Sequence, residues 1–110
     1  MKITKENFKI KDKPGDCLKF VLPNSFFGNH TVELRNHVFD TSNKGFDQVY
    51  IDATKVEKID LSGINEIIHV NHQLHQDDKE LILLYKKTSI LEEWIESTSM
   101  DKFVTIAVIP

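Results

Sequence analysis

The first part of the chain alternates apolar and polar residues with the two-residue period of a β-strand. Phe8 and Ile10 lie between polar neighbours in "NFKIKDK", as in a strand with one buried face. Lys13–Asp16, "KPGD", places Pro next to Gly and is a strong turn signal. The apolar pattern resumes in Cys17–Leu22, and Pro23 ends it. We therefore predict a β-hairpin at the start of the fold.

Helical and strand patterns then alternate to the end of the chain. A first helix is indicated by apolar residues at helical spacing before the stop signal Asn43–Gly45, and these residues are Val32, Leu34, Val38 and Phe39. A second helix follows Asp60 in "INEIIHVNHQL", and a third carries the apolar stripe Ile90, Leu91, Trp94 and Ile95. The segments with strand patterns are Phe46–Ala53, Leu81–Tyr85 and Phe103–Ile109.

The resulting order of elements is β-β-α-β-α-β-α-β. Strands that alternate with helices are joined by crossover connections, which place the strands in parallel and the helices against the sheet. We therefore predict an α/β fold with a mixed, mostly parallel β-sheet and helices packed against it. The chain has 110 residues, so we expect one domain over residues 1–110.

Charge and composition exclude several classes of function. The net charge is −3 and the Lys and Arg residues do not cluster, so binding of nucleic acid through its phosphates is not expected. No apolar run approaches the roughly 20 residues of a membrane-spanning helix, and the polar start lacks a secretory signal pattern. Cys17 is the single cysteine, which excludes an internal disulfide. We expect a cytoplasmic protein without a cofactor.

The segment "KIDLSGINE" lies where a strand pattern passes into a helical one. Asp60 or Ser62 can accept hydrogen bonds from the free N–H groups of the first helical turn, and the Asp60 charge suits the helix dipole. Gly63 permits a close backbone approach or an unusual dihedral angle. These residues either only cap the helix or also form a docking or modification site, because helix N-termini stabilise phosphate well.

From Val49 onward, the sequence resembles a STAS domain, the module of bacterial anti-sigma factor antagonists and of sulphate-transporter tails. The shared pattern is a strand that ends in Asp, an apolar-Asp-Ser-Ser-Gly-apolar loop, a helix, a buried strand, a further helix and a final strand. The residues that fill its positions are Asp52, Ile59, Asp60, Ser62, Gly63, Ile64, Leu91, Ser99, Phe103 and Ile106. The part before Phe46 fits by the order of its elements and not by motif.

Two departures from the family pattern change what the resemblance implies. In sporulation-type antagonists the phosphorylated hydroxyl follows the loop Asp directly, and here that position holds Leu61, which has no hydroxyl. The loop before the first helix, which usually ends in an acidic residue, reads "NSFF" over Asn24–Phe27. The domain then either binds its partner constitutively or is controlled elsewhere, and the candidate phosphorylation positions are Ser62 and, with weaker support, Thr54.

The resemblance implies a non-enzymatic regulatory domain that docks a protein, such as an anti-sigma factor or a kinase-type regulator, and so regulates a sigma factor and transcription. We predict that Asp60, Leu61, Ser62 and Gly63 form the docking loop, with Phe26 and Phe27 as neighbours. At least one of the two phenylalanines is expected in the core. The alternatives are an accessory subunit of a transporter or signalling complex and, ranked last, an enzyme or small-ligand binder.

The remaining candidate chemistry favours packing over catalysis or metal binding. His69, His72 and His75 recur at steps of three on the second helix and drift around it, so a shared metal ion is not expected. His75 projects toward the apolar side of that helix. Cys17 is interpreted as a small packed residue of a strand rather than a nucleophile, because no flanking motif supports catalysis.

Overall fold

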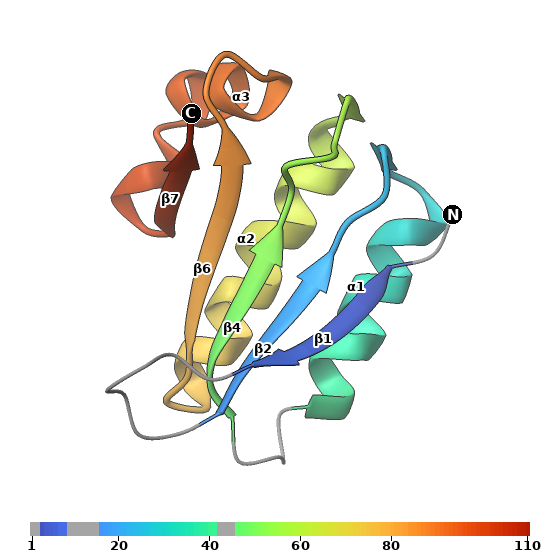
Figure 1. Ribbon diagram of the computed structural model, residues 1–110, viewed down its shortest axis with the longest axis vertical. Helices are drawn as coiled ribbons and strands as arrows, with labels where there is room; N and C mark the ends of the chain where they lie inside the picture. Colours follow the sequence, from blue (N-terminus) through green and yellow to red (C-terminus); the bar gives the residue numbers. More distant parts are fainter. Residues whose placement is uncertain (1–2, 9–15, 42–45) are drawn as a thin grey trace.

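The fold is a β-sheet with helices on one side, seen in a computed structural model that describes residues 3–8, 16–41 and 46–110 (Figure 1). The elements in chain order are β1 (Thr4–Phe8), β2 (Asp16–Val21), β3 (Ser25–Phe26), α1 (Asn29–Thr41), β4 (Phe46–Asp52), β5 (Lys58–Ile59), α2 (Leu61–Gln76), β6 (Glu80–Lys86), α3 (Ile90–Thr98), the 3₁₀ helix η1 (Met100–Lys102) and β7 (Thr105–Ile109). No helix in these described ranges is long and apolar enough to cross a membrane.

The main sheet has five strands in the order β1-β2-β4-β6-β7. The first strand pairs with β2 in antiparallel fashion, and every later pair is parallel, which confirms the predicted mixed, mostly parallel sheet. Each crossover moves one strand further along the sheet in the same direction. Since such crossovers are right-handed, α1 and α2 lie together on one face, behind the sheet in Figure 1.

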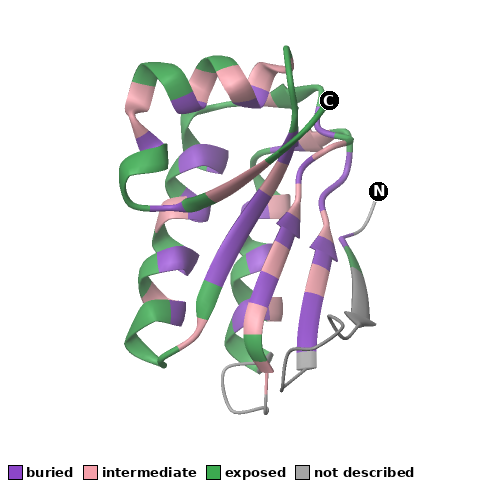
Figure 2. Ribbon diagram, turned by 60° about the vertical axis from the view of Figure 1, so that its left-hand side comes forward, coloured by how far each residue is buried: buried purple, intermediate pink, exposed green. Residues whose placement is uncertain are grey.

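The hydrophobic core lies between the sheet and these helices. Alternate strand residues point toward the helices, so Val49 and Ile51 of β4 are fully buried, while Gln48 and Tyr50, which alternate with them, are partly exposed. The buried stripes of the helices face these strands, as Figure 2 shows. The apolar residues of α1 and α2 in the core are Leu34, Val38, Ile64, Ile67, Val70 and Leu74.

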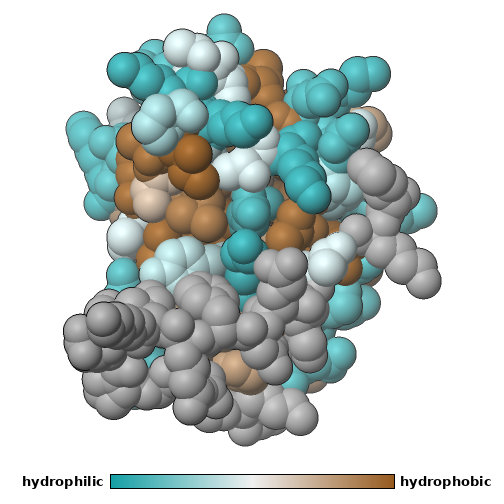
Figure 3. Space-filling model, viewed as in Figure 1, coloured by the Kyte–Doolittle hydropathy of each residue, from teal (hydrophilic) through white to brown (hydrophobic). Residues whose placement is uncertain are grey.

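The opposite face of the sheet carries no helix in the part of the chain that the structure describes. Figure 3 shows this face, with apolar side chains gathered where β6 and β7 lie in Figure 1. On β7, Val108 and Ile109 are 51% and 39% exposed. These two exposed apolar residues lie on the edge strand of the sheet that is opposite to β1.

The structure differs from the sequence prediction in three places. The first strand covers Thr4–Phe8, so it begins before the predicted segment "NFKIKDK" and shares only its first two residues. The short strands β3 and β5, which pair in a separate sheet, were not predicted. The last strand begins at Thr105 and not at Phe103, because a 3₁₀ helix over Met100–Lys102 precedes it. The carbonyl oxygen of Met100 accepts hydrogen bonds from the N–H groups of Phe103 and Val104, so these two residues belong to the turn and not to the strand. The predicted turn residues 13–15, the helix stop at 43–45 and Ile10 lie outside the described residues.

Candidate functional site

The two-stranded sheet of β3 and β5 brings two distant loops side by side. The strands run parallel, with Phe26 opposite Ile59. The carbonyl oxygen of Asn24 accepts two hydrogen bonds, of 2.7 and 3.0 Å, from N–H groups at the start of β5. Because parallel strands end at the same side, Phe27 and Asp60 leave the pair as neighbours. The predicted adjacency of the "NSFF" and "DLSG" loops is therefore confirmed.

Gly63 allows helix α2 to begin directly against β3. A Cβ atom on Gly63 would lie 2.4 Å from the carbonyl oxygen of Phe26 and 2.7 Å from Cγ1 of Ile59. Both distances are far below van der Waals contact, and one of the two atoms belongs to the backbone. Of the two predicted reasons for glycine, a close approach or an unusual dihedral angle, the close approach is the one that the structure confirms. Gly63 itself is buried and offers no side chain to a partner.

Asp60 is the N-cap of α2, as the sequence predicted. Its extended backbone (φ −121°, ψ −174°) lets its carboxylate accept a hydrogen bond from the Gly63 N–H at 3.2 Å. The Ser62 hydroxyl donates to the same carboxylate oxygen at 2.5 Å. Ser62, which the sequence suggested as a cap, thus supports the capping residue and does not cap the helix itself. The hydrogen bond from Ser62, and then that from Gly63, lowers the pKa of Asp60 below its ordinary value.

The two phenylalanines of the first loop have opposite environments. Phe26 is fully buried, which confirms that at least one of them belongs to the core, whereas Phe27 is 43% exposed. Phe26 was predicted as a partner contact, and its burial removes it from the surface. Across from this loop, Leu61 is 57% exposed, and Asp60 and Ser62 are exposed beside it. We call the exposed set Phe27, Asp60, Leu61 and Ser62 the Phe27–Leu61 surface.

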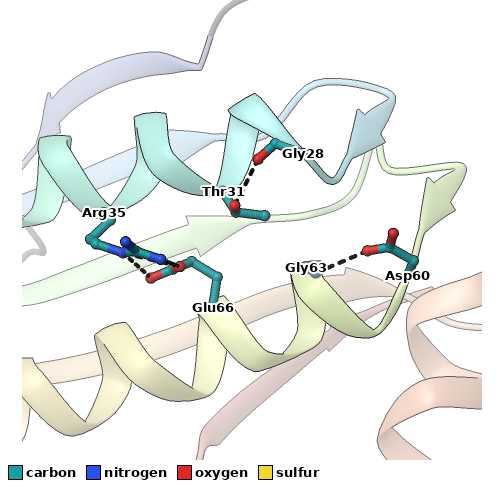
Figure 4. A network of polar contacts seen from close by, with 6 residues as sticks. All are labelled: Gly28, Thr31, Arg35, Asp60, Gly63 and Glu66. Atoms are coloured by element: carbon teal, nitrogen blue, oxygen red, sulfur yellow. Dashed lines mark hydrogen bonds and ion pairs between the residues drawn. The ribbon is translucent and has the colours of Figure 1, made fainter.

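The turn that carries Phe27 is fixed at the start of α1. Gly28 has a left-handed backbone (φ +60°) that favours glycine. The Thr31 hydroxyl donates to the Gly28 carbonyl at 2.7 Å (Figure 4). Nδ1 of His30 lies 2.8 Å from the Ser25 carbonyl oxygen. Both sides of the Phe27–Leu61 surface are thus held by hydrogen bonds before any partner is present.

An ion pair that sequence reasoning missed joins α1 to α2 beside this surface. Arg35 donates through Nε, at 3.2 Å, and through Nη2, at 2.5 Å, to the carboxylate of Glu66 (Figure 4). Glu66 is only 4% exposed, and its carboxylate raises the pKa of Arg35. The sequence held one signal for this pair: Glu66 lies one helical turn before Val70, on the apolar side of the helix.

The second candidate phosphorylation position, Thr54, lies in the turn after β4. Its hydroxyl donates to the Asp52 carboxylate at 2.6 Å, and its N–H donates to the same oxygen at 3.0 Å. Nζ of Lys19 lies 3.9 Å from the other oxygen of that carboxylate. The Thr54 hydroxyl is partly buried and engaged in this turn, whereas the Ser62 side chain is exposed.

The histidines and the cysteine lie apart from the Phe27–Leu61 surface. His69, His72 and His75 are all exposed, so the prediction that His75 turns toward the apolar side is wrong. His75 follows Leu74 directly and is therefore rotated by about 100° around α2, which places it outside the buried stripe that ends at Leu74. Among the described residues, no three His, Cys, Asp or Glu side chains are grouped to hold a metal ion. Cys17 is 3% exposed, and its Sγ donates to the Gln48 side chain, as expected of a packed residue.

No family model and no curated protein matches the sequence. Among solved structures, the fold is similar to the crystal structure of a proposed anti-sigma factor antagonist from Thermotoga maritima, with a TM-score of 0.73 at 19% identity. This match covers 96% of the present chain and 86% of the other. An NMR structure of the same Thermotoga protein gives a TM-score of 0.73 at 17% identity, over 93% of this chain and 78% of the other. The chain therefore has the fold of a proposed anti-sigma factor antagonist, which confirms the predicted STAS-like fold.

Proposed function

We propose that this chain is a non-enzymatic regulatory domain that binds a protein partner through the Phe27–Leu61 surface. The observation that supports the proposal is the pairing of β3 with β5, which brings the loop that carries exposed Phe27 next to the segment that leads into exposed Leu61 at the start of α2. Aromatic and large apolar residues in such positions are favoured anchors of protein interfaces. The similarity of the fold to a proposed anti-sigma factor antagonist supports a partner of the anti-sigma factor class.

The proposed mechanism is competition for that partner. The domain occupies the anti-sigma factor and thereby releases the sigma factor that it held. Hydrogen bonds already fix the two loops of the surface, through Asp60 on one side and through Thr31 on the other. A surface that is ordered before binding loses little conformational entropy on association, which favours affinity.

Leu61 gives the interaction a different control from that of the sporulation-type antagonists. The side chain next to Asp60 is apolar and cannot carry a phosphate, so binding is constitutive at this position. Ser62 is the exposed hydroxyl of the Phe27–Leu61 surface. A phosphate there would place a second negative group against the Asp60 carboxylate, which now accepts the Ser62 hydrogen bond. Phosphorylation of Ser62 would therefore disturb the helix cap and weaken docking.

A release assay tests the proposed function. A candidate anti-sigma factor from the same genome is purified in complex with its sigma factor, and the present chain is added in increasing amounts. We expect free sigma factor to appear in proportion to the added chain, and a complex of the chain with the anti-sigma factor to form. If the chain binds none of the genome's anti-sigma factors, or binds one without releasing sigma factor, the proposed mechanism is wrong.

A further inference from the structure

Strand β7 forms one edge of the main sheet, at the left of Figure 1. In the part of the chain that the structure describes it pairs only with β6, so its outer side presents N–H and C=O groups without a strand partner. The carbonyl oxygen of Ile109 accepts a hydrogen bond from the Lys87 N–H at 2.9 Å and therefore points toward β6. Because this direction alternates along a strand, the backbone groups of Ile106 and Val108 point outward.

The sequence of β7 lacks the features that keep edge strands from pairing. The strand reads TIAVI, without charge or proline, and its register with β6 runs without a bulge. Thr105 and Ile109 are exposed, and Val108 is 51% exposed. By contrast, the sequence of the other edge strand, β1, is TKENF and includes a lysine and a glutamate. Natural edge strands use charges, proline and bulges against pairing, so β7 is the edge that is open to another strand.

The connection that precedes β7 is tied to the helix side of the sheet. Nδ2 of Asn71, a buried residue of α2, donates a hydrogen bond to the carbonyl oxygen of Phe103 at 3.1 Å. This bond holds the end of η1 against the helix layer. The exposure of Val108 and Ile109 shows that η1 does not cover the second half of the strand.

We propose that β7 pairs with β7 of a second copy of this chain in antiparallel orientation. With Ala107 opposite its own counterpart, Ile106 of each copy lies opposite Val108 of the other. These are the residues whose backbone groups point outward, so each such pair exchanges both of its N–H···O hydrogen bonds. Ala107 then occupies the non-hydrogen-bonded position, where the two Cα atoms approach to about 4.5 Å, and its small side chain suits that approach.

The same register matches the side chains. Opposite residues of an antiparallel pair share one face of the sheet, and Ile106 and Val108 both lie on the helix side. Ile106 packs against the core there, and Val108 gains an apolar neighbour in Ile106 of the second copy. The sheets of the two copies become continuous, with all helices on one face. Two five-residue strands make a smaller contact than a standard interface, so the dimer should be reversible and depend on concentration.

Sedimentation of the purified chain over a range of concentrations tests the pairing, and we expect a monomer–dimer equilibrium. Val108→Lys places a charge on the pairing edge, as natural edge strands do, and should raise the dissociation constant of the dimer about tenfold or more. The control Val32→Lys makes the same change at a residue of α1 that is 46% exposed. It should leave that constant within about twofold.

Thermal melts confirm that both lysine variants fold. A chain that stays monomeric at every concentration, or an equal effect of the two variants, would overturn the proposal. The pairing does not rest on the Phe27–Leu61 surface, so each proposal can fail without the other.

Disulfide formation between copies tests the register. In the presence of oxidised glutathione, Ala107→Cys should give covalent dimers, because the two new thiols lie opposite each other. Thr105→Cys should give far fewer, since Thr105 lies opposite Ile109 of the second copy. The wild type should give none, because its single cysteine, Cys17, is 3% exposed. Equal cross-linking of the two variants, or no cross-linking of either, would contradict antiparallel pairing centred on Ala107.

Discussion

The carbonyl oxygen of Phe26 occupies the space that a side chain on Gly63 would need, with 2.4 Å between that oxygen and the position of a Cβ atom. This contact sets the start of α2 against strand β3, and with it the distance between the loops that carry Phe27 and Leu61. One side of the contact is a backbone atom in a hydrogen-bonded strand pair, so it cannot move aside cheaply.

Substitution of Gly63 should therefore destabilise the fold. We expect Gly63→Ala to lower the free energy of unfolding by about 1–3 kcal/mol, because the added methyl group forces β3 and α2 apart. Urea denaturation followed by circular dichroism measures this change. An unchanged urea midpoint would contradict this prediction, because it would show that β3 and α2 can move apart without a loss of stability.

Gly28 provides a matched control for this prediction. A Cβ atom there meets nothing within 4 Å, but the backbone is left-handed (φ +60°). Gly28→Ala should cost stability through the backbone alone, and Gly28→Asn should cost less, because Asn tolerates that conformation. At Gly63, where space and not dihedral angle is limiting, Asn should be worse than Ala.

The stability that the Asp60 cap contributes should depend on pH. Hydrogen bonds from Ser62 and Gly63 hold the pKa of Asp60 below its ordinary value in the folded chain. A carboxylate with a lowered pKa stabilises the fold fully above its unfolded pKa, and this contribution is lost as the pH falls through the folded pKa. The difference in stability between the wild type and Asp60→Asn should thus be full at pH 7 and shrink below about pH 4.

The matched variant for this measurement is Ser62→Ala. It removes the main cause of the lowered pKa while the Gly63 N–H remains, so the pKa of Asp60 should rise toward its ordinary value. An NMR titration of the Asp60 carboxyl carbon reads this directly. A pKa equal in the two proteins would mean that the Ser62 hydroxyl does not donate to Asp60 in solution.

The ion pair between Arg35 and Glu66 should stabilise the contact of α1 with α2 as a unit. Arg35→Met leaves the carboxylate of Glu66, which is 4% exposed, without its partner, and should lower the melting temperature by several degrees. The double variant Arg35→Met/Glu66→Leu should recover much of that loss, because no buried charge remains. A double-mutant cycle by thermal unfolding measures the coupling. If the losses of stability from the two single variants simply added up in the double variant, the two residues would not be coupled and the prediction would be wrong.

Sequence patterns predicted the main elements of the fold because they contain dense or regularly spaced apolar residues. Val49, Tyr50 and Ile51 form a continuous apolar run, of which Val49 and Ile51 are fully buried and Tyr50 is partly exposed. Ile64, Ile67 and Val70 repeat at helical spacing and are all buried. The two-residue strands β3 and β5 are too short to show a period. They form because distant parts of the chain meet, which no local pattern encodes.

In the candidate site, too, the sequence predicted the features that depend on local structure and not those that depend on contacts between distant parts of the chain. Asp60 and Gly63 are of the residue types that a helix start requires, and their roles follow from that local need. Local sequence does not say which of Phe26 and Phe27 is buried, because that depends on the pairing of β3 with β5. The partnership of Arg35 with Glu66 depends on how two helices pack, and a sequence shows only that a carboxylate lies on an apolar face.

The most direct test of the proposed docking surface compares two double variants that each remove exposed apolar side chains. Phe27→Ala/Leu61→Ala truncates the Phe27–Leu61 surface, and Val108→Ala/Ile109→Ala truncates exposed residues of β7. Calorimetry with the purified anti-sigma factor should show affinity lowered about a hundredfold by the first variant and unchanged by the second, with thermal melts confirming that both fold. Undiminished binding by Phe27→Ala/Leu61→Ala, or an equal loss in both variants, would contradict docking through this surface.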